Sequence, residues 1–89
     1  MEQVKKLLDS RVKPYKYVMY DNIVTVVDKD QKEIKHFSLP SNIRNAICFH
    51  DMYYCLDKIA FIVATQDCYD TRLLVDEDTL EIVNLGYDK

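Results

Sequence analysis

A single glycine, Gly86, occurs among the 89 residues, and this scarcity excludes several kinds of site. Nucleotide-binding loops of the G-x-G-x-x-G and P-loop types need glycine where the backbone approaches a phosphate, and the nucleophile elbow G-x-S-x-G needs it for a strained turn. The H-E-x-x-H and C-x-x-C motifs are also absent. The chain carries no signature of an enzyme, and we expect a non-enzymatic protein without a cofactor.

Long apolar runs are missing too. The longest, Ile59 to Ala64, falls far short of the roughly 20 residues that span a bilayer. The N-terminal segment MEQVKKLLDSR has an acidic residue at position 2 and lacks the apolar region of a signal peptide. Three cysteines, an odd number, fit free thiols better than a disulfide framework. These features predict a cytoplasmic protein with no membrane partner.

Charge is unevenly distributed along the chain. Residues 1–45 carry nine Lys and Arg against six Asp and Glu, and residues 46–89 carry three against nine, so the net charges are +3 and −6. Each half could attract partners of opposite sign, although any solvated surface carries charge. The segment KPYKYVMY interleaves basic and aromatic residues as single-strand-binding proteins do, but the acidic total argues against a nucleic-acid partner.

The first residues show a helical spacing of apolar side chains. Val4, Leu7 and Leu8 fall at positions i, i+3 and i+4, and Pro14 follows as a stop. We therefore predict an amphipathic helix over residues 2–12. It must pack on a sheet, because about three turns of helix are marginally stable alone.

From Tyr15 the pattern alternates with a period of two residues, which is typical of strands. It predicts an antiparallel meander over residues 15–39 and another over residues 59–85. Residues 41–58 fit either a helix or a hairpin that turns at His50-Asp51, and their Ile, Cys, Phe and Tyr content favours the hairpin.

The predicted fold is one domain over residues 1–89, mainly β, or α+β at the margin. It combines the N-terminal helix with an antiparallel β-meander of six to eight short strands. These strands could form two duplicated three-stranded units.

The two meanders share a motif, V-D-x-D-x-x-E-I, in VVDKDQKEI (residues 26–34) and LVDEDTLEI (residues 74–82). A calcium loop would need more oxygen ligands and a glycine at its bend, so the motif predicts a turn. Its first aspartate would close the turn, and its second would take a left-handed conformation. The hairpins resemble those of β-propeller blades, which implies antiparallel strands, although two such units cannot close a propeller. A duplication and convergent turns both explain the repeat.

One cluster of metal-ligating residue types is present. Cys48, His50, Cys55 and Cys68 would satisfy tetrahedral zinc, but their spacing lacks the usual C-x2–4-C knuckle. Cysteine is also commonly buried as a small apolar residue, so these thiols more simply belong to the core.

Seven tyrosines and no tryptophan give the chain its most informative excess. Tyrosine combines a large rigid contact area with a polar tip and is enriched at interfaces, but it also fills half-buried strand positions. Together with nearby cations, the tyrosines supply the candidate binding residues. These are Tyr15, Lys16, Tyr17, Tyr20, Arg44, Tyr53, Tyr54 and Tyr69.

The sequence therefore predicts a small binding protein that acts by protein–protein interaction. Short, single-domain, glycine-poor chains with this Lys-, Ile-, Asn-, Asp- and Tyr-rich composition are typical of phage and mobile-element inhibitors of host factors, which would act in the host cytoplasm. Two alternatives stay open: an oligomer that sequesters a nucleotide-like anion through Lys13, Lys16 and Arg44, or a small zinc-stabilised domain. Because a meander leaves unpaired edge strands and the core is thin, we also expect a homo-oligomer, in particular a homodimer.

Overall fold

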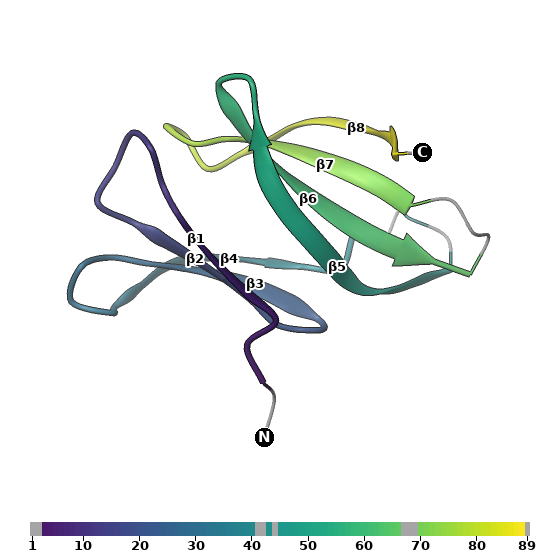
Figure 1. Cartoon of the computed structure of the whole chain (residues 1–89), viewed down its shortest axis with the longest axis horizontal. Helices are drawn as coiled ribbons and strands as arrows, with labels where there is room; N and C mark the ends of the chain where they lie inside the picture. Colours follow the sequence, from purple (N-terminus) through teal and green to yellow (C-terminus); the bar gives the residue numbers. More distant parts are fainter. Residues whose placement is uncertain (1–2, 41–42, 44, 67–69, 89) are drawn as a thin grey trace.

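The computed structural model describes residues 3–40, 43, 45–66 and 70–88, and it contains two four-stranded antiparallel sheets (Figure 1). The first sheet consists of β1 (Lys6–Asp9), β2 (Lys16–Met19), β3 (Ile23–Val27) and β4 (Glu33–Ser38). The second consists of β5 (Ala46–Cys55), β6 (Lys58–Thr65), β7 (Asp70–Asp76) and β8 (Ile82–Asp88). Spatial order follows chain order in both sheets, so each is a meander. The prediction of a mainly β protein is confirmed.

The helix predicted over residues 2–12 is wrong. Within the described part of that segment, residues 6–9 form β1, which pairs with β2 through the register Leu7–Val18 and Leu8–Tyr17. A three-turn helix is marginal, whereas a strand gains ladder hydrogen bonds from its neighbour. The alternation places Leu8 against the core and leaves Leu7 on the opposite face, 53% exposed. Leu7 and Leu8 are compatible with the spacing of a helix and with the alternation of a strand, so the sequence pattern does not distinguish the two structures here.

Each repeated unit has four strands rather than the expected three. β1 adds a strand to the first unit, and β5 adds a strand to the second. The expected turn at His50-Asp51 is absent, because β5 continues through ten residues with a bulge between Phe49 and Asp51. The chain instead reverses between β5 and β6, where Leu56 has a φ of 57°.

Both copies of V-D-x-D-x-x-E-I form the turn between the last two strands of their sheet. The Asp28 Oδ1 atom accepts two backbone N–H groups at 2.9 Å each, and the Asp76 Oδ1 atom accepts two at 2.8 and 3.2 Å. The first aspartate therefore closes each turn, as predicted. The left-handed conformation does not fall on the second aspartate but on Gln31 and Leu80, with φ of 64° and 60°.

The core lies between the two sheets. Alternate residues of the strands point inward from each sheet and are almost completely buried. Phe61 stands at the centre and makes edge-to-face contacts with one aromatic ring of its own sheet and two of the other, at centroid distances of 5.2 to 6.3 Å. The buried cluster consists of Tyr17, Met19, Val24, Val26, Phe37, Phe49, Met52, Ile59, Phe61, Val63, Leu73, Val75 and Leu80.

The sheets meet along their first strands. β1 lies beside β5, and Figure 1 shows the two sheets as separate layers, with β1–β4 at lower left and β5–β8 at upper right. Each sheet therefore has an inner face, which covers the core, and an outer face, which points away from the other sheet.

Replacing Phe61 with alanine should lower the free energy of unfolding by about 3–5 kcal/mol, because it removes the ring that contacts both sheets. Urea denaturation measures the change. The control Ile34→Ala removes a side chain that is 41% exposed and should alter the free energy by no more than about 0.5 kcal/mol. Similar losses in both variants would contradict a core centred on Phe61.

Candidate functional site

The outer face of the first sheet contains an open hollow of about 730 Å³. Strand alternation brings Leu7, Val18 and Thr25 into one row across this face, and Val27 follows on β3. The hollow has an apolar floor, with Leu7 53% exposed and Val4 47% exposed beside it. The complete lining is Val4, Leu7, Asp9, Ser10, Lys13, Pro14, Tyr15, Lys16, Val18, Tyr20, Val27, Asp28, Lys29 and Gln31.

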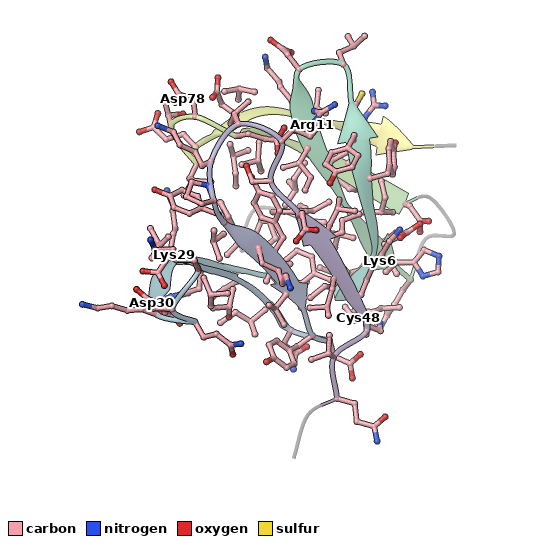
Figure 2. The ribbon with its side chains drawn as sticks, turned by 60° about the vertical axis from the view of Figure 1, so that its left-hand side comes forward. Lys6, Arg11, Lys29, Asp30, Cys48 and Asp78 are labelled. Carbon is pink, nitrogen blue, oxygen red and sulfur yellow. The ribbon has the colours of Figure 1, made fainter. Side chains whose placement is uncertain are left out.

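Charged side chains of both signs surround the hollow. Three lysines and two aspartates line it, which gives the rim a small positive excess. The Lys16 ammonium lies 4.0 Å from the Asp9 carboxylate across neighbouring strands, and Lys13 reaches Asp78 of the second sheet at 3.2 Å. Lys29 projects from the turn between β3 and β4, at the left of Figure 2. The rim of the hollow thus carries charges of both signs, while its floor is apolar.

The structure brings three of the predicted binding residues together. Tyr15, Lys16 and Tyr20 all line the hollow. Tyr17 does not belong to the site, because its side chain is completely buried in the core.

Two further predicted binding residues lie away from the hollow. Tyr53 and Tyr54 are on β5, and Tyr54 is 39% exposed near the junction of the sheets. Arg44 and Tyr69 fall outside the described residues.

Sequence reasoning missed the floor of this site. Helical spacing places Leu7 and Val4 in the expected helix and does not predict that Leu7 is exposed on a sheet face, with Val4 just before β1. The sequence pattern predicts for Val27 and Lys29 only a strand and a turn. The signal that could have found them is alternation: extending the period of two back through residues 6–9 places Leu7 on the same face as Val18.

The three candidate zinc ligands that the structure describes do not come together. Cys48 and Cys55 are half-buried free thiols on one strand. Seven residue steps of strand separate them by about 23 Å, whereas ligands of one zinc ion lie within a few ångströms of each other. His50 is exposed at the bulge of the same strand, and Cys68 lies outside the described residues. The described part of the chain contains no group of three or more His, Cys, Asp or Glu residues that could hold a metal.

A buried ion pair fastens the first sheet to the second. Glu77, in the turn after β7, has a side chain only 1% exposed. Its Oε2 atom accepts from Arg11 Nε at 3.0 Å and lies 2.9 Å from Arg11 Nη2, while Oε1 accepts from the Arg11 backbone N–H at 3.2 Å. The Tyr17 hydroxyl donates to Oε1 at 3.4 Å. We call Glu77, Arg11 and Tyr17 the Glu77 clamp.

Further contacts hold the Glu77 clamp in place. Arg11 Nη2 donates to the Lys58 carbonyl at 2.9 Å, and the guanidinium lies 4.3 Å from the centre of the Tyr54 ring. The Tyr54 hydroxyl donates to the Asp9 carbonyl. In Figure 2, Arg11 lies at the top of the molecule, where the turn after β1 meets the second sheet. No buried side-chain nitrogen or oxygen in the described residues lacks a partner, so the clamp is a satisfied structural contact.

A second polar contact joins the sheets at the other end of β1. Lys6 Nζ lies 2.6 Å from Asp51 Oδ1, and this hydrogen bond holds the pKa of the Asp51 carboxyl below its usual value. Lys5 Nζ donates to the Phe49 carbonyl at 2.6 Å and pairs with Asp21 at 3.0 Å. Lys6 and Asp51, like Arg11 and Glu77 and like Lys13 and Asp78, therefore pair a cation of the first half of the chain with a carboxylate of the second half.

A comparison with family models, curated proteins and solved structures gave no match. The described residues also contain no candidate for a membrane-spanning helix. The site must therefore be interpreted from its own geometry.

Replacing Arg11 and replacing Glu77 should lower the free energy of unfolding by different amounts. Arg11→Met leaves the Glu77 carboxylate buried without its cation and should lower the free energy of unfolding by about 3–5 kcal/mol. Glu77→Gln leaves an arginine that is 37% exposed and can be solvated, so the loss should be smaller, about 1–3 kcal/mol.

Urea denaturation of both variants measures this difference. The double variant Arg11→Met/Glu77→Leu removes both charges and should be more stable than Arg11→Met alone. If the double variant loses as much free energy of unfolding as the two single variants together, the two charges do not interact.

Alkaline pH should weaken the fold through Tyr17. Burial raises the pKa of the Tyr17 hydroxyl from 10.0 to about 12, and the neighbouring Glu77 carboxylate adds to the shift. The folded state holds this proton more tightly than the unfolded state does. The contribution of the Tyr17 hydroxyl to the free energy of unfolding is therefore complete below pH 10 and is lost as the pH rises from 10 to about 12. In Tyr17→Phe, the free energy of unfolding should fall less over this pH range, and a fall as steep as in the wild type would refute the role of Tyr17.

Proposed function

We propose that the chain is a small non-enzymatic binding protein that acts through protein–protein contact, with the hollow on the first sheet as its contact surface. The observation that carries this proposal is the gathering of half-exposed apolar side chains, Leu7 and Val4, with Val18 and Val27 in one concave region. Apolar residues scattered singly over a surface need no explanation, but a contiguous group rimmed by polar residues is typical of an interaction site.

The residues around the hollow suit a protein partner. Tyr20 can contribute rigid contact area and a hydroxyl, as tyrosines at interfaces do, whereas Tyr15 lines the hollow but is partly buried against the core. The lysines and aspartates form a polar rim around the apolar floor, which matches the usual arrangement of protein interfaces. A complementary partner would present apolar side chains at the centre and, facing Lys16 and Lys29, acidic groups.

Such a protein would act by covering part of its partner's surface. The composition of the chain favours an inhibitor of a host factor, encoded by a phage or another mobile element.

A nucleotide-like anion is the second candidate ligand for the same hollow. Its support is the placement of Lys13 and Lys16 beside Tyr15 and Tyr20, where charge and stacking could act together. Asp9 and Asp28 also line the hollow and would repel an anion. The opposed carboxylates and the apolar floor favour a protein partner.

The variant Leu7→Glu tests the contact surface. It places a carboxylate on the floor of the hollow at a position already 53% exposed, so the fold should persist. The control Leu56→Glu makes the same change at a side chain 91% exposed on the turn between β5 and β6, outside the hollow. Both variants and the wild type would be used to capture proteins from a lysate of the source cells.

We expect one protein to be retained by the wild type and by Leu56→Glu but lost with Leu7→Glu. Calorimetry with that protein in purified form should then show at least tenfold weaker binding to Leu7→Glu. Captured proteins that respond equally to both variants would overturn the assignment of the hollow.

A further inference from the structure

We infer that β8 is a second interaction surface and that its partner is β8 of another copy of this chain, paired antiparallel about a two-fold axis at Leu85. The four-stranded second sheets of the two copies would then form one continuous antiparallel sheet. None of the residues that line the hollow belongs to β8. The inference therefore goes beyond the proposed function.

Two of the four sheet edges already meet inside the molecule. β1 lies beside β5, and each strand has a backbone carbonyl bound by a side chain from the other unit of the chain. The Tyr54 hydroxyl donates to the Asp9 carbonyl of β1, and Lys5 Nζ donates to the Phe49 carbonyl of β5 at 2.6 Å. The Phe49 backbone N–H donates to the Asp21 carbonyl at 2.7 Å. Pairing with another chain is therefore left to β4 and β8, the last strands of the two sheets.

The two remaining edges differ in how they are protected. β4 contains Glu33 and Lys35, and Pro40 follows two residues after its end. Charged side chains and proline are means by which natural proteins prevent the pairing of sheet edges. β8 contains no lysine, arginine or proline, and Ile82 and Val83 at its start are 47% and 49% exposed. Figure 1 shows β8 on the side of the second sheet that is away from β1–β4, so its edge faces away from the first sheet.

The single glycine of the chain lies in this edge strand. Gly86 pairs with Arg72 in a regular part of the register, and its φ is not positive. Neither a bulge nor a left-handed conformation therefore requires a glycine at this position. A glycine inside a strand weakens it, and often marks a place where another backbone approaches closely. Close approach of a second strand accounts for Gly86 in β8.

The charges in and around β8 favour a second copy as the partner. In the sequence, Glu81 and Lys89 each lie four residues from Leu85, on opposite sides of it. Antiparallel pairing with Leu85 on the axis therefore sets an acidic position of one copy opposite a basic position of the other at both ends of the paired strands. The same register sets Asn84 opposite Gly86 and brings no two charges of one sign opposite each other. The edge is thus complementary to itself.

This axis also continues the apolar row of the core. The register of the second sheet aligns Met52, Phe61 and Leu73, all buried, and the next position of the row is Leu85 at the edge. Pairing at Leu85 would place the rows of the two copies end to end. The apolar face of the second sheet would then run without interruption across the dimer.

Two opposite substitutions at one position test this pairing. In the dimer, Ile82 of each copy would lie opposite Asp88 of the other. Ile82→Glu would therefore create two pairs of like charges, and Ile82→Lys would create two pairs of opposite charges. Ile82 is 47% exposed, so both variants should fold, and circular dichroism and urea denaturation check this.

Native mass spectrometry and light scattering at tens of micromolar should show a dimer of the wild-type chain. Ile82→Glu should weaken dimerisation at least about tenfold, whereas Ile82→Lys should leave it unchanged or strengthen it. The double variant Ile82→Glu/Asp88→Lys should restore the dimer. The control Ile34→Glu makes the same change on β4, at a side chain that is 41% exposed, and should remain dimeric.

Disulfide cross-linking measures the register directly. Opposite residues of antiparallel strands have Cα atoms about 4.5–5.5 Å apart, which is within the range that a disulfide spans. Under mild oxidation, a mixture of Ile82→Cys and Asp88→Cys should form a disulfide that links position 82 of one chain to position 88 of the other. Peptide mapping by mass spectrometry identifies this link, and neither variant alone should form a disulfide between two copies of its introduced cysteine.

A monomeric wild-type chain would overturn the inference. So would a dimer that Ile82→Glu and Ile82→Lys affect equally, or one that Ile34→Glu abolishes. If Ile82→Glu does not fold, Ile82→Lys/Asp88→Lys replaces it, because lysines of the two copies then lie opposite each other and a persisting dimer would contradict the pairing.

The variant Leu7→Glu separates this inference from the proposed function. Its change lies in the hollow, so it should remain a dimer even though it loses the protein captured there. Failure of the hollow as a contact surface would leave the pairing of β8 intact, and a monomeric chain could still capture a protein through the hollow.

Discussion

The buried carboxylate of Glu77 is the contact on which the arrangement of the two sheets depends. It comes from the last turn of the second sheet and binds the first turn of the first sheet, so it joins segments 66 residues apart in the sequence. Desolvating a carboxylate is expensive and is offset only by good geometry. Here the guanidinium, a backbone N–H and the Tyr17 hydroxyl all contact it. Such a contact fixes one orientation of the sheets, which apolar packing alone specifies less sharply.

The Glu77 clamp also shapes the candidate site. Residues on either side of Arg11, including Ser10 and Lys13, line the hollow, while Arg11 itself is held by the second sheet. Lys13 pairs with Asp78, the residue after Glu77. The rim of the hollow on the first sheet is therefore positioned by the second sheet. This connection makes the two-sheet unit, rather than either sheet, the smallest part of the chain that can present the site.

The sequence predicted the features that depend on local patterns. Alternation identified most strands, and the first aspartate of each V-D-x-D-x-x-E-I motif closes its turn as expected. β1 was missed because Leu7 and Leu8 satisfy both helical and strand spacing, and only pairing with β2 decides between them. Sequence alternation does not show which face of a sheet is covered, so it does not distinguish the buried Tyr17 from an exposed binding residue. The partnership of Arg11 and Glu77 carries no local signal at all.

The repeat acquires its meaning only when the pattern and the packing are combined. From sequence alone, two similar turns are compatible with a duplication or with convergence. In the structure the two turns differ by one residue, because Val27 pairs with Glu33 whereas the equivalent Val75 pairs with Ile82. Val27 therefore lies on the outer face of its sheet while Val75 is buried between the sheets. The shared aspartate closes both turns, but the number of residues that follow it sets the register of the returning strand and so decides which face of each strand is buried.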